Sequence, residues 1–174
     1  MEGTKKRENK ILVEKRNKCF SQKISKIISE NKMNRETFAK SIGVSESLIC
    51  RYLKKERFPT GEVIYRIAKT YNLSVDWLIG RSKKKNISNP NNSDLPPALG
   101  FSIRYYQLLR ENNMMKIEFS KKYQELANIK DAKTKSFTYK HAEMVPNIGS
   151  LIIISDIFGV SIDYVLNLTD EKNS

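Results

Sequence analysis

Histidine, cysteine and long apolar runs are scarce in this sequence of 174 residues, and each scarcity excludes a class of function. The single histidine, His141, leaves little room for histidine-based catalysis. The two cysteines, Cys19 and Cys50, lack the CxxC spacing of a metal or redox site. The longest apolar run, 151–154, is far shorter than the roughly 20 residues of a membrane helix. No nucleophile–base pair or glycine-rich phosphate loop is apparent, so we expect neither an enzyme nor a bound cofactor or metal.

Acidic residues are also few, and the resulting charge is unevenly placed. Lysine and arginine total 32 against 19 aspartates and glutamates, which gives a net charge of +13. Residues 1–19 carry +4, residues 20–82 carry +6, residues 83–99 carry +2 and residues 100–174 only +1. The basic excess indicates a polyanionic partner, above all nucleic acid, for the first half of the chain. The polar start of the sequence and its cysteine usage favour a cytoplasmic location. The richness in lysine, asparagine and isoleucine indicates an AT-rich bacterial or phage genome, so we expect the bacterial nucleoid or a phage-infected cell.

An internal repeat organises the chain. The apolar positions of 20–28 have the spacing of one helix face, and the same spacing returns from Phe101, 81 residues later. Segment 71–78 resembles segment 158–165 at an offset of 87, so the second copy holds about six extra residues. We therefore predict an all-α protein of two tandem five-helix domains. The predicted parts are a basic N-terminal tail (1–19), a first domain (20–82), a polar linker (83–99) and a second domain (100–174).

The N-terminal tail has two interpretations, a disordered basic arm or a backward extension of the first helix. Capping signals then divide the first copy. Asn34, Ser45, Thr60 and Ser74 are N-cap residues, and Gly43 supplies the positive φ of a sharp turn. The predicted helices are 20–31, 35–42, 46–55, 61–71 and 75–79.

The first copy also carries a family pattern. Its marked positions are Ala39, Gly43, Val44, Ser45 and Ile49 within 38–52, followed by Pro59, 67–69 and 73–78. These residues resemble the lambda-repressor-like (Xre or Cro type) helix-turn-helix family over residues 20–80. The resemblance implies a DNA-binding domain whose third helix lies in the major groove. One departure is Lys55, where the family commonly has glycine, so either that loop is strained or the third helix is longer.

The resemblance also implies which side chains meet DNA. Glu46, Ser47 and Arg51 take the base-contacting positions: Arg51 suits guanine O6 and N7, Glu46 suits cytosine N4, and Ser47 suits either kind of edge. The phosphate-contacting candidates are Arg35, Lys40, Ser45, Lys54, Lys55 and Arg57. The alternative is that Glu46 and Arg51 are an exposed helix-surface pair and that the lysines are only solvated.

The second copy keeps the outer helices but not the helix-turn-helix. Thr138 stands where the first copy has Arg51, so the base-contacting residues do not carry over. The helix predicted from 147 or 149 to 158 is apolar on nearly all sides and needs cover from more than one direction. We predict a dimer or partner interface at Leu151, Ile152, Ile153, Ile154 and Phe158. The alternatives are a monomeric spacer covered by its own insertion, and a diverged DNA reader with a remodelled helix at 133–141.

A sequence-specific DNA-binding regulator is the function that these features favour. We expect a repressor of phage or mobile-element type that binds a pseudo-palindromic operator as a homodimer through residues 20–82, with half-sites about 34 Å apart. The alternative is a protein-interaction factor, such as an antitoxin or an inhibitor of a host defence nuclease. In that case the first domain autoregulates its own promoter, and residues 100–174 bind the protein partner. Neither function involves a membrane.

Overall fold

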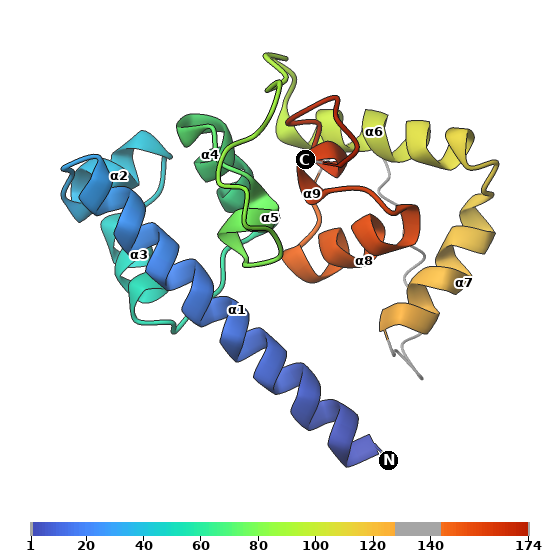
Figure 1. Ribbon diagram of the computed structural model, residues 1–174, viewed down its shortest axis with the longest axis horizontal. Coiled ribbons are helices and arrows are strands. Elements are labelled where there is room, and N and C mark those ends of the chain that lie inside the picture. The colour runs from blue at the N-terminus through green and yellow to red at the C-terminus, as the bar shows by residue number, and fades with distance from the viewer. Residues whose placement is uncertain (1, 128–143, 174) are drawn as a thin grey trace. The chain divides into compact units, whose positions relative to one another are not determined.

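The computed structural model describes residues 2–127 and 144–173, with side chains from residue 15 onward (Figure 1). The described residues form helices and no strand, which confirms the all-α class. The helices are α1 (Glu2–Glu30), α2 (Arg35–Ser41), α3 (Glu46–Leu53), α4 (Gly61–Tyr71), α5 (Val75–Leu78), α6 (Pro97–Glu111), α7 (Lys116–Ala127), α8 (Ile148–Phe158) and α9 (Ile162–Val165). The predictions for 133–141, including Thr138 and His141, lie outside the described residues.

The chain divides into two compact units. Unit 1 comprises Met1–Pro59 and Arg66–Asn86, and unit 2 comprises Thr60–Tyr65 and Ile87–Ser174. The start of α4 is therefore grouped with unit 2 and its end with unit 1. Each unit has its own set of fully buried aromatic and aliphatic side chains.

Local sequence explains where the helices of the first copy begin. The backbone N–H of Thr37 donates to Asn34 Oδ1 at 2.7 Å, and that of Trp77 donates to Ser74 Oγ at 3.1 Å. The other two predicted N-caps accept in the same way, Ser45 from Leu48 at 3.4 Å and Thr60 from Val63 at 3.3 Å. All four predicted caps are confirmed. Each satisfies a backbone N–H that has no partner within the helix.

Aromatic packing joins α1 to the helix-turn-helix. Phe20 is 1% exposed and meets Tyr52 and Phe58 edge to face, with ring centres 5.6 and 5.8 Å away. Phe38 is fully buried and stacks on Tyr71 at 5.4 Å. Burial raises the pKa of the Tyr52 phenol, because the charged form loses its hydration. These contacts join α1 to α3 and α2 to the end of α4.

The first helix is longer than 20–31. It begins at Glu2 and continues without a break into the core of unit 1, so the tail extends the helix backward and the disordered-arm interpretation is wrong. After Gly3 no glycine or proline interrupts the segment, and the Lys, Arg, Glu and Leu residues there favour a helix. In Figure 1, α1 continues well beyond the other helices of unit 1.

The predicted linker is held by backbone hydrogen bonds to the segments just before α5 and just after α9. The backbone N–H of Ser74 donates to the carbonyl of Lys85 at 2.9 Å, and that of Asn91 donates to the carbonyl of Leu168 at 2.7 Å. The next helix, α6, starts at Pro97 instead of Phe101, since proline suits the first helical position.

The helix α8 is capped by Asn147, whose Oδ1 accepts from the N–H of Ser150 at 3.0 Å, and most of its apolar side chains are buried. Of the five side chains predicted to form an interface, three are buried: Leu151 and Ile154 fully, and Ile152 at 8% exposure. A buried side chain offers no surface to a partner, so the prediction does not hold for these three. Neighbouring elements supply the cover that the sequence demands. Ile153 and Phe158 are half-buried.

The same internal contact occurs in both units at the predicted offsets. Phe38 stacks on Tyr71 with an angle of 23° between the ring planes. Phe119, 81 residues after Phe38, stacks on Phe158, 87 residues after Tyr71, at 5.6 Å and 12°. Both Phe38 and Phe119 are fully buried.

Candidate nucleic-acid interface

A sharp turn joins α2 to α3. Gly43 has a φ of +65°, which a side chain-bearing residue adopts at a steric cost, so glycine is suited to this place. Arg66, on α4, donates to the Gly43 carbonyl at 3.3 Å and braces the turn. Ser45 then ends the turn and caps α3, while its Oγ lies 3.0 Å from Ser47 Oγ. The turn therefore fixes the direction in which α3 leaves.

The helix α3 presents one polar arc and buries the other side. Ile49 is fully buried and Tyr52 is 1% exposed, which anchors the inner side. The predicted base-contacting residues Glu46, Ser47 and Arg51 are all exposed. Glu46 and Arg51 form no ion pair with each other among the described residues, which weighs against a surface pair as their role.

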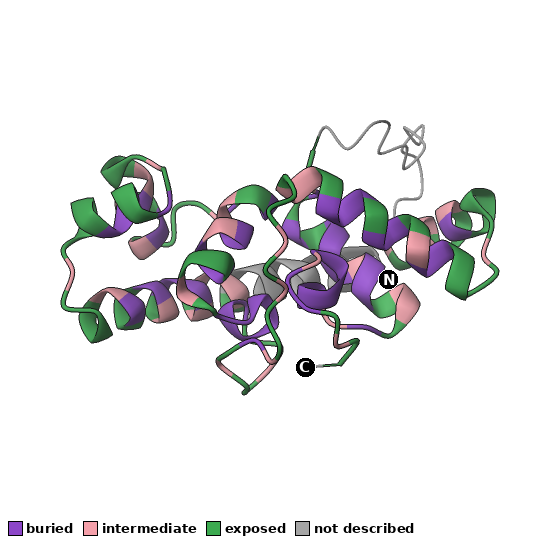
Figure 2. Cartoon of the chain, turned by 90° about the horizontal axis from the view of Figure 1, so that it is seen from above, coloured by how far each residue is buried: buried purple, intermediate pink, exposed green. Residues whose placement is uncertain are grey.

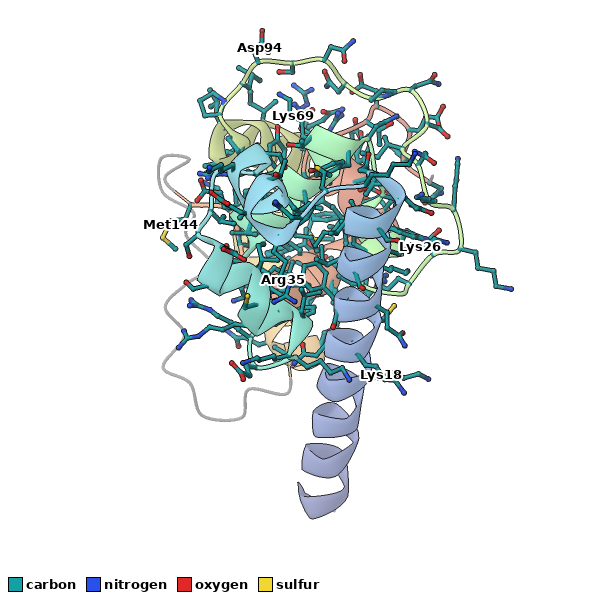
Figure 3. The ribbon with its side chains drawn as sticks, turned by 90° about the vertical axis from the view of Figure 1, so that its left-hand side faces the viewer. Lys18, Lys26, Arg35, Lys69, Asp94 and Met144 are labelled. Atoms are coloured by element: carbon teal, nitrogen blue, oxygen red, sulfur yellow. The ribbon has the colours of Figure 1, made fainter. Side chains whose placement is uncertain are left out.

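The predicted phosphate contacts on α2 differ in how they are held. Arg35 Nη1 lies 3.7 Å from Cys50 Sγ, so its guanidinium sits beside α3 (Figure 3). Lys40 instead pairs with Glu36 one turn earlier on α2, at 2.7 Å. Both members of that pair are largely exposed, so it contributes little to stability. Arg35 is therefore placed beside α3, whereas the charge of Lys40 is partly offset along α2.

The C-terminal end of α3 resolves the question about Lys55. The helix ends at Leu53, Lys54 forms its C-cap, and Lys55 has a φ of +63°. The strained-loop interpretation therefore holds, and the longer helix 46–55 is wrong. A left-handed conformation costs a residue with a side chain about 1–2 kcal/mol. Lys54, Lys55 and Arg57 are all exposed there.

The attachment of α1 to the end of α3 is not predicted by the sequence pattern. Ser21 Oγ donates to the Leu53 carbonyl at 2.8 Å, which attaches α1 to the last turn of α3. Lys18 lies one turn before Ser21 and is exposed (Figure 3). The spacing of Lys18 and Ser21, three residues apart, places both side chains on one face of a helix. This spacing could be used only once α1 was seen to include both residues.

Comparison with known proteins agrees with this geometry. Residues 24–78 match the family model described as helix-turn-helix, and the match runs from within α1 to the end of α5. This segment is therefore a lambda-repressor-like helix-turn-helix domain, as the resemblance implied. No curated protein matches the chain, and no solved structure does.

Two further findings bear on other kinds of site. Within the described part of the chain, no three His, Cys, Asp or Glu side chains gather where they could hold a metal ion. Over the same residues, none of the helices combines the length and the apolar character needed to cross a membrane.

Proposed function

We propose that this protein is a sequence-specific transcriptional regulator, a repressor of phage or mobile-element type. In this proposal a homodimer binds a pseudo-palindromic operator, with one α3 in the major groove at each half-site. The observation that carries it is the exposed arc of Glu46, Ser47 and Arg51 on a capped helix of a helix-turn-helix domain. It acts on DNA in the cytoplasm by binding rather than by catalysis.

The charge distribution supports a division of labour within the chain. Residues 1–82 carry +10 of the net charge of +13 and include the matched domain, whereas residues 100–174 carry +1. We propose that unit 2 is a diverged second copy that has lost DNA contact; the recurring ring stack supports this. The alternative role as an antitoxin or nuclease inhibitor stays a prediction from sequence.

An affinity comparison tests the base-reading role. An operator is first selected from random DNA with the full-length protein, and binding is then measured on the operator and on unrelated DNA. Arg51→Ala should weaken operator binding by about 1–3 kcal/mol and leave non-specific binding nearly unchanged, because a lost base contact affects only the matching sequence. Lys121→Ala is the matched control, since it removes an exposed charge from α7, away from both α3 and α6.

Two outcomes would contradict the proposal. An equal loss by Arg51→Ala on every sequence would make Arg51 a phosphate contact. Failure to select any preferred sequence would reject sequence-specific regulation altogether. Lys54→Ala serves as a positive control for the phosphate role, with a uniform loss and a salt slope reduced by about one.

A further inference from the structure

Large exposed apolar side chains gather in unit 2. They are Leu95, Leu99, Ile103, Tyr106, Met115, Ile117, Leu126 and Met144. The described side chains of unit 1 add none to this set. Scattered exposed apolar residues are normal, but a concentration in one unit marks an interaction surface.

Three of these residues form one stripe on α6, which we call the α6 stripe: Leu99, Ile103 and Tyr106. Their spacing of four and three residues puts them on one helix face, where they are 37%, 48% and 45% exposed. In Figure 2, α6 carries exposed residues on one face and buried residues on the other, and the buried face packs on the rest of unit 2. The stripe is thus a second apolar face on a helix that already has an inner one.

The equivalent face of unit 1 is polar. The residues 81 positions before the α6 stripe are Lys18, Gln22 and Ser25, all exposed on α1. The corresponding helix face therefore carries polar side chains in unit 1 and apolar side chains in unit 2, and both faces are exposed. This difference is not a demand of the fold, since both helices bury their inner faces alike.

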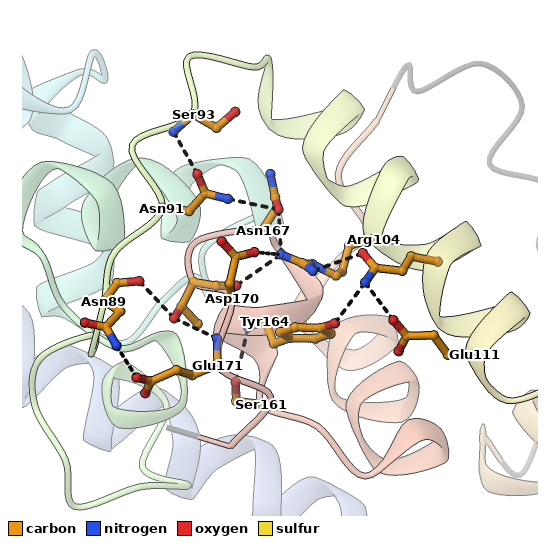
Figure 4. A network of polar contacts seen from close by, with 12 residues as sticks. Asn89, Asn91, Ser93, Arg104, Glu111, Ser161, Tyr164, Asn167, Asp170 and Glu171 are labelled. Atoms are coloured by element: carbon orange, nitrogen blue, oxygen red, sulfur yellow. Dashed lines mark hydrogen bonds and ion pairs between the residues drawn. The ribbon is translucent and has the colours of Figure 1, made fainter.

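The α6 stripe also carries no outward charge. From residue 95 to 109 the single charged residue is Arg104, which is 5% exposed. Its guanidinium turns inward and donates to Asn167 Oδ1 at 2.8 Å and to the Thr169 carbonyl at 3.2 Å (Figure 4). It also pairs with Asp170. A partner can therefore cover Leu99 and Ile103 without removing a charge from water, which is the costly part of burial.

Charges of opposite sign flank the two ends of the α6 stripe. Exposed Asp94 precedes it in the sequence, and Arg110 follows it. The adjacent carboxylate of Glu111 is already paired with a lysine of its own unit, so this end stays basic. Lys116 Nζ lies 4.9 Å from the centre of the Tyr106 ring. An antiparallel pairing of two α6 helices brings the acidic end of each stripe to the basic end of the other. The pattern is self-complementary, as a two-fold contact requires.

We propose that the α6 stripe is a two-fold contact with a second copy of this chain, with Ile103 nearest the axis. The choice of a second copy rests on the proposed function, since a pseudo-palindromic operator needs two domains. Charge favours it too: residues 100–174 contribute only +1 of the +13, so pairing through unit 2 avoids the strongly basic segments. The 15 residues of α6 span about 22 Å, and a strip of that length and one helix wide, about 10 Å, covers much less than the roughly 800 Å² per partner of a standard interface. The free dimer is therefore weak, and DNA completes it.

Sedimentation velocity of the full-length protein, from about 1 to 300 µM, tests this contact. Wild type should show concentration-dependent dimerisation, and Ile103→Glu should weaken it at least about tenfold, because a two-fold contact sets the two new carboxylates against each other. Gln22→Glu is the matched control: it puts the same charge at the equivalent position of α1 and should leave the dimer unchanged. Circular dichroism checks the fold, and Ile103→Gln provides a neutral second variant with a smaller loss.

Mixing two variants identifies the occupant. Ile103→Glu and Ile103→Lys should each be monomeric alone and should dimerise when mixed, because opposite charges then meet at the axis. A wild type that stays monomeric at every concentration, or an Ile103→Glu variant that dimerises like wild type, would overturn the proposal. No recovery in the mixture would also overturn it, and would leave a different partner or residues 128–143 of the same chain as the cover. A dimer that selects no DNA sequence would reject the proposed function and leave the contact standing.

Discussion

The two units share internal contacts and differ on their outer faces. In unit 1 the Lys23 ammonium lies 4.3 Å from the centre of the Trp77 ring; in unit 2 the Arg104 guanidinium lies 4.0 Å from that of Tyr164. These pairs are again related by offsets of 81 and 87. A cation on an aromatic ring is thus retained while both residue types change. Packing inside each unit restricts which residues can occupy these positions, whereas the residues of the outer face can differ without disturbing that packing.

A close approach between helices is also retained, with the small residue exchanged. In unit 1 a Cβ added to Gly80 would lie 2.8 Å from Cys19 Sγ, too close to be accommodated without a shift. In unit 2 the equivalent of Cys19 is Gly100, and the equivalent of Gly80 is Asn167, whose Cβ lies 3.3 Å from a Cβ built on Gly100. Each pair contains one glycine, which is the second residue of the pair in unit 1 and the first in unit 2. Only one side chain fits between the two backbones, so the other residue must be glycine.

The largest effect is expected from truncating the stacked phenylalanines. Phe38→Ala and Phe119→Ala should each lower the free energy of unfolding of their own unit by about 3–5 kcal/mol, because each leaves a large cavity among buried rings. Urea denaturation measures this loss. DNA binding should distinguish the two variants. Phe38→Ala should no longer bind DNA, because the helix-turn-helix unfolds, whereas Phe119→Ala should still bind a single half-site. Loss of half-site binding in Phe119→Ala would show that unit 2 supports the DNA-binding unit directly.

A smaller loss of stability is expected from removing the cation that lies over an aromatic ring in each unit. Arg104→Ala should cost about 2–4 kcal/mol, because Asn167 Oδ1 and the Thr169 carbonyl lose their shared donor. The matched Lys23→Ala should cost less, since burial lowers the pKa of Lys23 and its removal relieves that desolvation. Thermal unfolding of both variants measures the difference. Equal losses would mean that ring packing, rather than hydrogen bonding, dominates at both positions.

The smallest effect is expected from two equivalent surface ion pairs, and it depends on pH. Lys85 Nζ lies 2.7 Å from Glu30 Oε2, and Lys172 Nζ lies 3.0 Å from Glu111 Oε2. Hydrogen bonds from Lys85 lower the pKa of Glu30, and those from Gln107 and then Lys172 lower the pKa of Glu111. A lowered carboxyl pKa stabilises the fold above the ordinary glutamate pKa of about 4.3, and this stability is lost as the pH falls below it.

Glu30→Gln and Glu111→Gln should therefore lower the melting temperature slightly at pH 7 and reduce its dependence on pH between about 5 and 3. Both pairs are exposed, so added salt should shrink the difference from wild type. The Glu111 hydrogen bond raises the pKa of Lys172, so unit 2 also loses a little stability as the pH rises past the ordinary lysine pKa. If neither substitution changes the pH dependence, these two ion pairs do not contribute to the stability of either unit.

Local signals allowed much of unit 1 to be predicted. The caps at Asn34, Ser45 and Ser74 and the positive φ of Gly43 depend on one residue and its immediate neighbours, so single-residue chemistry suffices. The exposure of Arg51 on α3 follows from helical periodicity for the same reason. The start of α1 was open because residues 4–18 hold no apolar residues at helical spacing.

By itself, the sequence determined the class, the helix-turn-helix and the offsets of 81 and 87 at which similar contacts recur, because these are recorded in spacing, caps and turn residues along the chain. Only the tertiary structure decided which apolar residues remain at the surface. The apolar side chains Leu151 and Ile154 of α8 are buried, whereas Ile103 and Tyr106 of α6 are exposed, although all four occupy helical positions. Burial depends on which other elements pack against a helix, and that information lies in contacts between distant segments rather than in local pattern.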